Sequence, residues 1–235
     1  MILMPGDNTV ADNTRPEVPS TEGIALLMGD PKRAILRLAW PMIAAMLLMS
    51  TYNIVNAIWV AGLGSDALAA VGFVTPLFMI LIGLSNGLGA GVASVISRRI
   101  GAKDRKGADN AAVHALILVI ILSATLTVPL ILLTGPIVTL FGAGDTAGLA
   151  TEYGQIIFLG MILILFTNIA YAILRAEGDA TWAMYVMGAS AVLNIILDPL
   201  LIYTAGMGIA GAAWGLIFSL VTVSCVLLYW FFIKR

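Results

Sequence analysis

The sequence predicts an all-α integral membrane protein, a bundle of six transmembrane helices with both termini in the cytoplasm. Of its 235 residues, 60% are hydrophobic and only 11% are charged. A soluble domain is closer to half apolar and about a quarter charged. Two further observations support this prediction. The chain contains six apolar stretches, and its basic residues all fall on one side of them. Lipid as the solvent allows so many apolar side chains to face outward.

The first segment, residues 1–30, differs in composition from the rest of the chain. It is polar and contains Pro5, Pro16 and Pro19 together with several acidic residues. The basic-then-apolar order of a cleavable secretion signal is missing from it. We therefore expect a flexible cytoplasmic tail over 1–30, followed by a six-helix lobe over 31–235.

The lobe divides into apolar stretches that each approach or exceed the ~20 residues needed to cross a bilayer. Their connections are short and rich in turn-forming residues, such as the glycines of 62–66, 142–145 and 206–208. The predicted spans are 34–61, 69–97, 110–134, 150–174, 182–204 and 209–233.

The positions of lysine and arginine give the predicted direction of the spans. All twelve lie before or at the start of the first span, after the last span, or in the two loops that share that side. By the positive-inside rule this side is cytoplasmic. The twelve are Arg15, Lys32, Arg33, Arg37, Arg98, Arg99, Lys103, Arg105, Lys106, Arg175, Lys234 and Arg235.

The second span contains Gly83, Gly87 and Gly91 at intervals of four residues, which places them on one helix face. Small residues let helices approach closely in lipid. Close helix packing is the expected role of this face. A surface along which helices slide during gating is the functional alternative.

The candidate site is centred on Asp198, an acid in the fifth span about 9 Å from the span's outer end at helical rise. Its charge would cost ~3 kcal/mol in hydrocarbon, so we expect it to face the bundle interior and to hold a proton or a cation. Asn194 lies one turn earlier on the same face, and Asn56 lies at a similar depth in the first span. The two asparagines could supply oxygens for Na⁺ at Asp198, or could only hydrogen-bond between helices. A carboxyl that is hydrogen-bonded for structure alone is the alternative for Asp198.

Two further polar groups could line a substrate cavity or could simply tie helices together. Tyr52 and Asn53 belong to the first span, and Asn168 and Tyr171 to the fourth. The chain has one histidine and one cysteine, so the sequence offers no catalytic set or metal cluster. We expect neither an enzyme nor a nucleic-acid-binding protein, and no cofactor.

The order of these features resembles the multidrug and toxic compound extrusion (MATE) family, in its N-terminal lobe and among its archaeal and bacterial members. Any one motif would be weak, but the set covers about residues 30 to 235 in the family's order. The matching segments are Pro41 with 52–56 and 62–64, then 98–102 with 108–109, then 173–179, and finally 193–199 followed by 208–213.

The resemblance implies export of amphipathic and cationic drugs from the cell, driven by inward H⁺ or Na⁺ through alternating access. It assigns Asn194 and Asp198 to a cation site, and it places Tyr52 and Asn168 in the cavity. Asn56 occupies the place of an aspartate in the first span, and Leu216 that of a hydroxyl residue in some relatives. One carboxylate therefore stands where two are expected, which suits proton coupling better than sodium coupling.

The family's members have twelve spans in two lobes, so we expect a second six-helix lobe or a parallel homodimer as partner, within the plasma membrane. Parallel repeats are a known transporter plan. Two alternatives remain: a flippase for lipid-linked substrates, which would favour a cationic cavity, and a non-transporting half or assembly partner.

Overall fold

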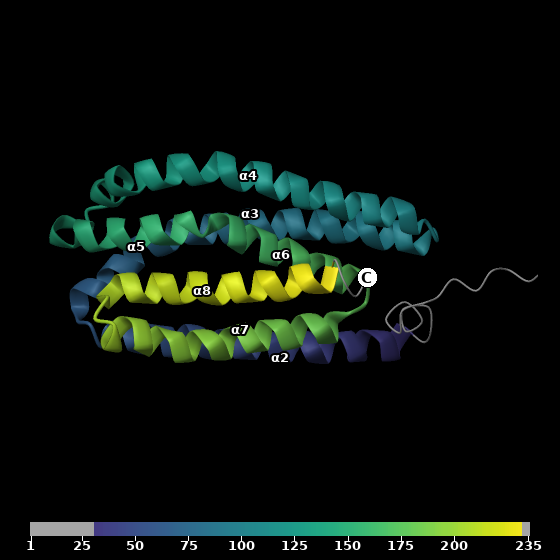
Figure 1. The fold of residues 1–235 in the computed structure, drawn as a ribbon, viewed down its shortest axis with the longest axis horizontal. Helices are drawn as coiled ribbons and strands as arrows, with labels where there is room; N and C mark the ends of the chain where they lie inside the picture. Colours follow the sequence, from purple (N-terminus) through teal and green to yellow (C-terminus); the bar gives the residue numbers. More distant parts are fainter. Residues whose placement is uncertain (1–30, 232–235) are drawn as a thin grey trace, which may run out of the picture.

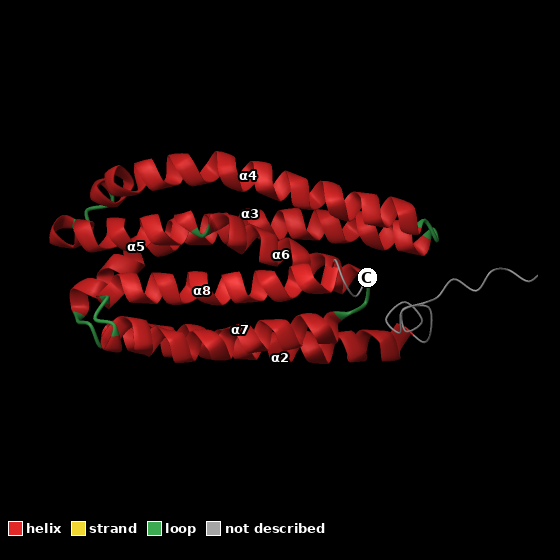
Figure 2. Cartoon of the chain, in the orientation of Figure 1, coloured by secondary structure: helices red, strands yellow, loops and turns green. Residues whose placement is uncertain are grey.

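The computed structural model describes residues 31–231, and the predicted tail, Lys234 and Arg235 lie outside this range. Long helices run side by side along the bundle (Figure 1). Only short loops join them (Figure 2). In chain order they are α2 Pro31–Ala61, α3 Ser65–Gly101, α4 Arg105–Leu140, the short η1 Gly144–Thr146, α5 Ala147–Leu159, α6 Met161–Ala176, α7 Ala180–Pro199, η2 Leu200–Thr204 and α8 Gly208–Tyr229.

Within the described residues, five single helices are long and apolar enough to cross a membrane, and a sixth crossing arises if α5 and α6 count as one bent span. The predicted all-α membrane fold is therefore confirmed. Each predicted span overlaps one of these helices or helix pairs, although the ends differ from the predicted bounds. The membrane orientation stays a prediction, although the α3–α4 and α6–α7 turns, which the described lysines and arginines flank, lie at one end of the bundle (Figure 1).

The fourth crossing differs from the continuous helix expected over 150–174. It bends by 49° between α5 and α6. Gly160 lies at the break, and a Cβ there would come within 2.9 Å of the Ile217 side chain of α8. The close approach of α8 therefore requires glycine at this position.

Helices α3 and α4 have 37 and 36 residues, more than the predicted 69–97 and 110–134. At about 1.5 Å per residue each is roughly 55 Å long, against a hydrocarbon thickness of about 30 Å. Pro129 and Pro136 lie inside α4 without ending it. The two helices must therefore tilt or extend beyond the hydrocarbon.

The chain changes helix type at the C-terminal end of α7, directly after Pro199. Residues Leu200–Thr204 form a π-helix, in which the Ala205 N–H donates to the Leu200 carbonyl over 2.8 Å. Proline has no N–H to donate to the preceding turn, which weakens the α-helical ladder at this point. The backbone of Gly211 in α8 packs against this turn so closely that a Cβ would lie 2.7 Å from the Leu201 carbonyl.

The buried core lies where α3, α4, α5, α6 and α8 meet, and α6 contributes the largest share of fully buried side chains. Helix α2 packs chiefly on α7 (Figure 1). This pairing positions the candidate site, because Asn56 and Asp198 belong to the two paired helices.

Candidate functional site

The packing of α2 on α7 brings Asn56 and Asp198 into direct contact. The Asn56 Nδ2 donates a hydrogen bond of 2.8 Å to the Asp198 Oδ2. Asp198 is 0% exposed. A carboxylate accepts and cannot donate, so Asn56 presents its N–H to the acid. The expected oxygen from Asn56 is therefore not the atom that faces Asp198.

The second carboxylate oxygen of Asp198 faces α8. Its Oδ1 is buried and has no hydrogen-bond partner among the described residues. It lies against Gly215, where a Cβ would collide with it. Sequence reasoning missed Gly215, although its place in the small-residue stretch that begins α8 was a visible signal. Glycine leaves the space that the carboxylate occupies.

The orientation of the Asn194 side chain is set by the Ser190 carbonyl, which can accept a hydrogen bond but cannot donate one. Its Nδ2 donates to the Ser190 carbonyl over 3.1 Å. The same carbonyl accepts from the Ser219 Oγ at 3.0 Å. Exchanging the amide nitrogen and oxygen would place two acceptors against each other. The Asn194 Oδ1 is thereby left buried without a hydrogen-bond partner among the described residues.

The two serines extend the polar contact between α7 and α8. Their hydroxyl oxygens lie 3.1 Å apart. Ser190, Asn194 and Asp198 follow one another at intervals of four residues, so they share a face of α7. That interval was a signal for Ser190 in the sequence. Ser219 had no such signal, because its partner lies 29 residues away.

Tyr52 is one turn before Asn56 and half-buried, and it lies close enough to Asp198 for an electrostatic interaction. Tyr153 of α5 interacts with Asp198 in the same way and was not found from the sequence. Asn53 is exposed in this lobe, and its Nδ2 donates to the Met49 carbonyl of its own helix at 2.9 Å. Tyr52 thus belongs to the surroundings of Asp198, whereas Asn53 faces away from the core.

The two candidates in α6 make contacts of a different kind. Asn168 is half-buried and donates to the Ile164 carbonyl of its own helix at 3.3 Å. Tyr171 is buried in an apolar cluster with Val186 of α7 and Val223 of α8. Tyr171 is thus packed among apolar side chains, and the substrate cavity expected from these four residues stays a prediction.

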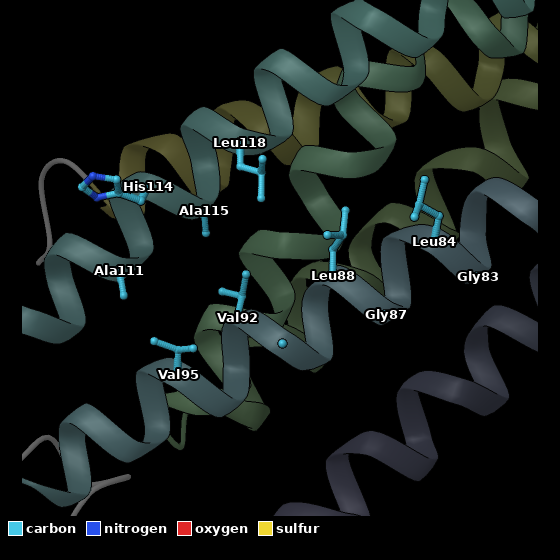
Figure 3. Close-up of a pocket in the computed structure, with 11 residues that line it drawn as sticks. Gly83, Leu84, Gly87, Leu88, Val92, Val95, Ala111, His114, Ala115 and Leu118 are labelled. Atoms are coloured by element: carbon cyan, nitrogen blue, oxygen red, sulfur yellow. The ribbon is translucent and has the colours of Figure 1, made fainter.

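The glycine face of α3 is open within the described lobe. A Cβ at Gly83, Gly87 or Gly91 would meet no atom within 4 Å. With α4 these residues line an apolar groove of about 730 Å³. Figure 3 shows Val92 and Leu118 pointing into it from opposite helices. The close packing expected of this face occurs instead at Gly89, whose Cβ would lie 3.3 Å from the Ala172 side chain.

Among the described residues there is no group of three or more His, Cys, Asp or Glu side chains that could hold a metal ion. The site is instead one buried acid with carboxamide and hydroxyl groups around it, between helices of membrane-spanning length. Such an arrangement is typical of a polytopic membrane protein that moves small ions or solutes.

Comparison with known proteins identifies the family. The family model MatE matches residues 41–200, and the chain belongs to this family of transporters, not to an enzyme family. A multidrug export protein MepA from Staphylococcus saprophyticus is 32% identical over 204 residues, covering 86% of this chain and 45% of the relative. A FAD transporter from Shewanella oneidensis is 30% identical over 199 residues, covering 83% and 44%.

Solved structures support the same assignment. The outward-facing form of a multidrug resistance MATE family transporter is 47% identical, with a TM-score of 0.89 over 92% of this chain. A transporter of the MOP superfamily from Pyrococcus furiosus, described by the reversed polarity of its binding pocket, gives the same identity and score. The chain covers 48% of each of these two proteins, so it spans about half the length of its relatives.

Proposed function

We propose that this chain is the N-terminal six-helix lobe of a multidrug efflux antiporter, in which H⁺ or Na⁺ binds at Asp198 and drug export follows by alternating access. The observation that carries the proposal is the state of the Asp198 carboxylate. It is fully buried, one oxygen accepts from Asn56, and the other has no donor among the described residues. A bare charge there would cost several kcal/mol, which uptake of a proton or a cation relieves.

The oxygens available to a cation are few. Asp198 Oδ1 and Asn194 Oδ1 are both buried without a hydrogen-bond partner in the described part of the chain. A proton needs only the first of them. Sodium prefers several oxygen ligands, and Asn56 directs an N–H to the acid. Proton coupling is therefore the simpler assignment, with sodium as the alternative that the experiment below distinguishes.

The proposal includes a partner and a place in the cell. Because the chain spans about half of its relatives, substrate would pass between this lobe and a second six-helix lobe, or between two parallel copies of this chain. The lobe would lie in the plasma membrane with both termini cytoplasmic, as the basic residues indicate. Amphipathic and cationic drugs are the proposed substrates, and FAD belongs in the same assay because one relative is a FAD transporter.

The test is efflux of a cationic dye, and separately of FAD, from cells that express the chain under imposed proton or sodium gradients. Wild type is compared with Asp198→Asn, and with Asp145→Asn as a control that removes an exposed acid within η1. We expect gradient-driven efflux in wild type and in the control, and its loss in Asp198→Asn. The gradient that drives efflux identifies the ion.

Two results would contradict the proposal. Equal efflux in wild type and Asp198→Asn would exclude the cation site. Absence of efflux from a well-inserted wild type, with or without a co-expressed second lobe, would favour a non-transporting half. Efflux that appears only with the second lobe would keep the cation site and exclude the homodimer.

A further inference from the structure

A second pair of residues joins α2 to α7 beyond the proposed cation site. The Tyr203 hydroxyl donates to the Trp59 carbonyl over 2.6 Å. Their rings meet edge to face, with centroids 6.2 Å apart and planes at 73°. Trp59 lies three residues after Asn56, and Tyr203 lies five residues after Asp198. We propose that Tyr203 is a positioning residue, which holds α2 against α7 so that Asn56 stays on Asp198. This inference rests on the proposed cation site.

The Trp59 carbonyl belongs to the last turn of α2, where four carbonyls lose their helical donors. Three of the four receive backbone donors from the following turn, since Gly62, Leu63 and Gly64 donate to the carbonyls of residues 58, 60 and 61. The Trp59 carbonyl instead accepts the Tyr203 hydroxyl. A side chain of one helix thus caps the end of the other.

The π-helix explains how Tyr203 reaches this position. In an α-helix, residues three or four apart share a face. A π-helix closes its hydrogen bond over five residues, as Ala205 and Leu200 do here. The widened turn returns the fifth residue after Asp198 to the side that faces α2. Single π turns are frequent at functional sites.

Gly62 provides the space that the hydroxyl needs. A Cβ at this position would collide with the Tyr203 hydroxyl oxygen and would lie 3.3 Å from the Trp59 carbonyl oxygen. Below the turn, Gly211 allows α8 to contact the Leu201 backbone directly. Glycines therefore lie on both sides of the contact between Tyr203 and Trp59. A substitution at Tyr203 disturbs the contact from η2, and a substitution at Gly62 disturbs it independently from the turn after α2.

The test measures cation binding directly, using sodium or protons alone as the probe on the purified full chain. The melting temperature is recorded against sodium concentration at fixed alkaline pH, and against pH without sodium. The variants are Tyr203→Phe, which keeps the ring and removes the hydroxyl, and Gly62→Ala, which displaces the hydroxyl from the other helix. Tyr185→Phe is the matched control, because Tyr185 is an exposed tyrosine of α7, the helix that directly precedes η2.

We expect the half-saturating cation concentration to shift in both Tyr203→Phe and Gly62→Ala by up to about tenfold, the loss of one net hydrogen bond. The midpoint moves because the Asn56 amide no longer donates to the Asp198 carboxylate that takes up the cation. The Tyr185→Phe midpoint should equal that of wild type.

An unchanged midpoint in either folded variant would overturn the positioning role, even if its melting temperature without cation fell. If Tyr203→Phe does not fold, Gly62→Ala decides alone. The proposed cation site is judged separately by Asp198→Asn. If wild type responds to neither cation, or if Asp198→Asn responds as wild type does, the cation site and the inference both fail.

Discussion

Gly215 lies directly against the carboxylate of Asp198, so that even a methyl group at position 215 would collide with the Oδ1 oxygen. This relationship brings α8 against the contact between Asn56 of α2 and Asp198 of α7. A larger residue at position 215 should therefore block the carboxylate oxygen while every polar atom of the site stays in place.

Gly215→Ala should therefore abolish ion-coupled efflux, because its Cβ takes the space in which Asp198 Oδ1 would receive a cation. Gly72→Ala is the control, since a Cβ at Gly72 meets no atom within 4 Å. That control should be neutral or should stabilise its helix by up to about 1 kcal/mol. Efflux and melting temperature are measured for both, and full efflux by a folded Gly215→Ala would contradict the site.

Asn56→Asp should make the chain strongly dependent on cations. The substitution places two carboxyl groups at the distance where the Asn56 amide now donates, 2.8 Å from Asp198. Two carboxylates so close cannot both remain charged without a shared proton or cation. We expect a larger rise in melting temperature with sodium than in wild type. An identical sodium response in the two proteins would indicate that the two side chains are not neighbours.

The open groove predicts that substitutions at two neighbouring glycines of α3 will change the melting temperature by different amounts. Gly87→Leu adds a side chain where nothing lies within 4 Å of a Cβ, so the melting temperature of the 235-residue chain should change little. Gly89→Leu must displace the Ala172 side chain, which a Cβ already approaches to 3.3 Å. Overpacking of this kind costs about 1–3 kcal/mol. Equal melting temperatures for the two variants would show that the α3–α6 contact is misplaced.

The contacts of Asp104, in the loop between α3 and α4, predict a small contribution to the stability of the fold that is lost in acid. The Gly107 backbone N–H, and then the Arg99 guanidinium at 2.8 Å, hold the pKa of this carboxyl below its ordinary value of 3.8. A lowered pKa stabilises the fold above the unfolded value, and the contribution disappears as the pH falls through the folded value. Asp104→Asn should therefore melt slightly below wild type at neutral pH and together with it in strong acid. A difference that is unchanged by pH would contradict this account. High salt should reduce the difference, since both side chains of the ion pair are exposed.

Much of the fold could be predicted because the relevant signals are local. The length of the apolar stretches predicted the spans. The four-residue spacing of Asn194 and Asp198 predicted that they share one face of a helix. The contact of Asn56 with Asp198 followed from equal depth in the membrane and from the family resemblance. These signals need no knowledge of how the helices pack.

The parts that could not be predicted depend on contacts between distant residues. Glycine at 160 looks like any other glycine until Ile217 lies against it. Ser219 and Tyr203 gain their roles from partners 29 and 144 residues away. The open groove beside Gly87 was expected to be packed, because a glycine stripe has the same sequence whether or not a helix covers it.

The π turn after Pro199 makes the chain sensitive to its own length at this point. Removing one residue between Pro199 and Tyr203 would make the tyrosine the fourth residue after Asp198, and an ordinary α-helical turn would then return it to the same face. Inserting one residue would instead turn the tyrosine ring by about 100° around the helix, and the end of α2 would lose its cap. In this segment an insertion should therefore do more harm than a deletion, because the π turn already holds one residue more than an α-helical turn.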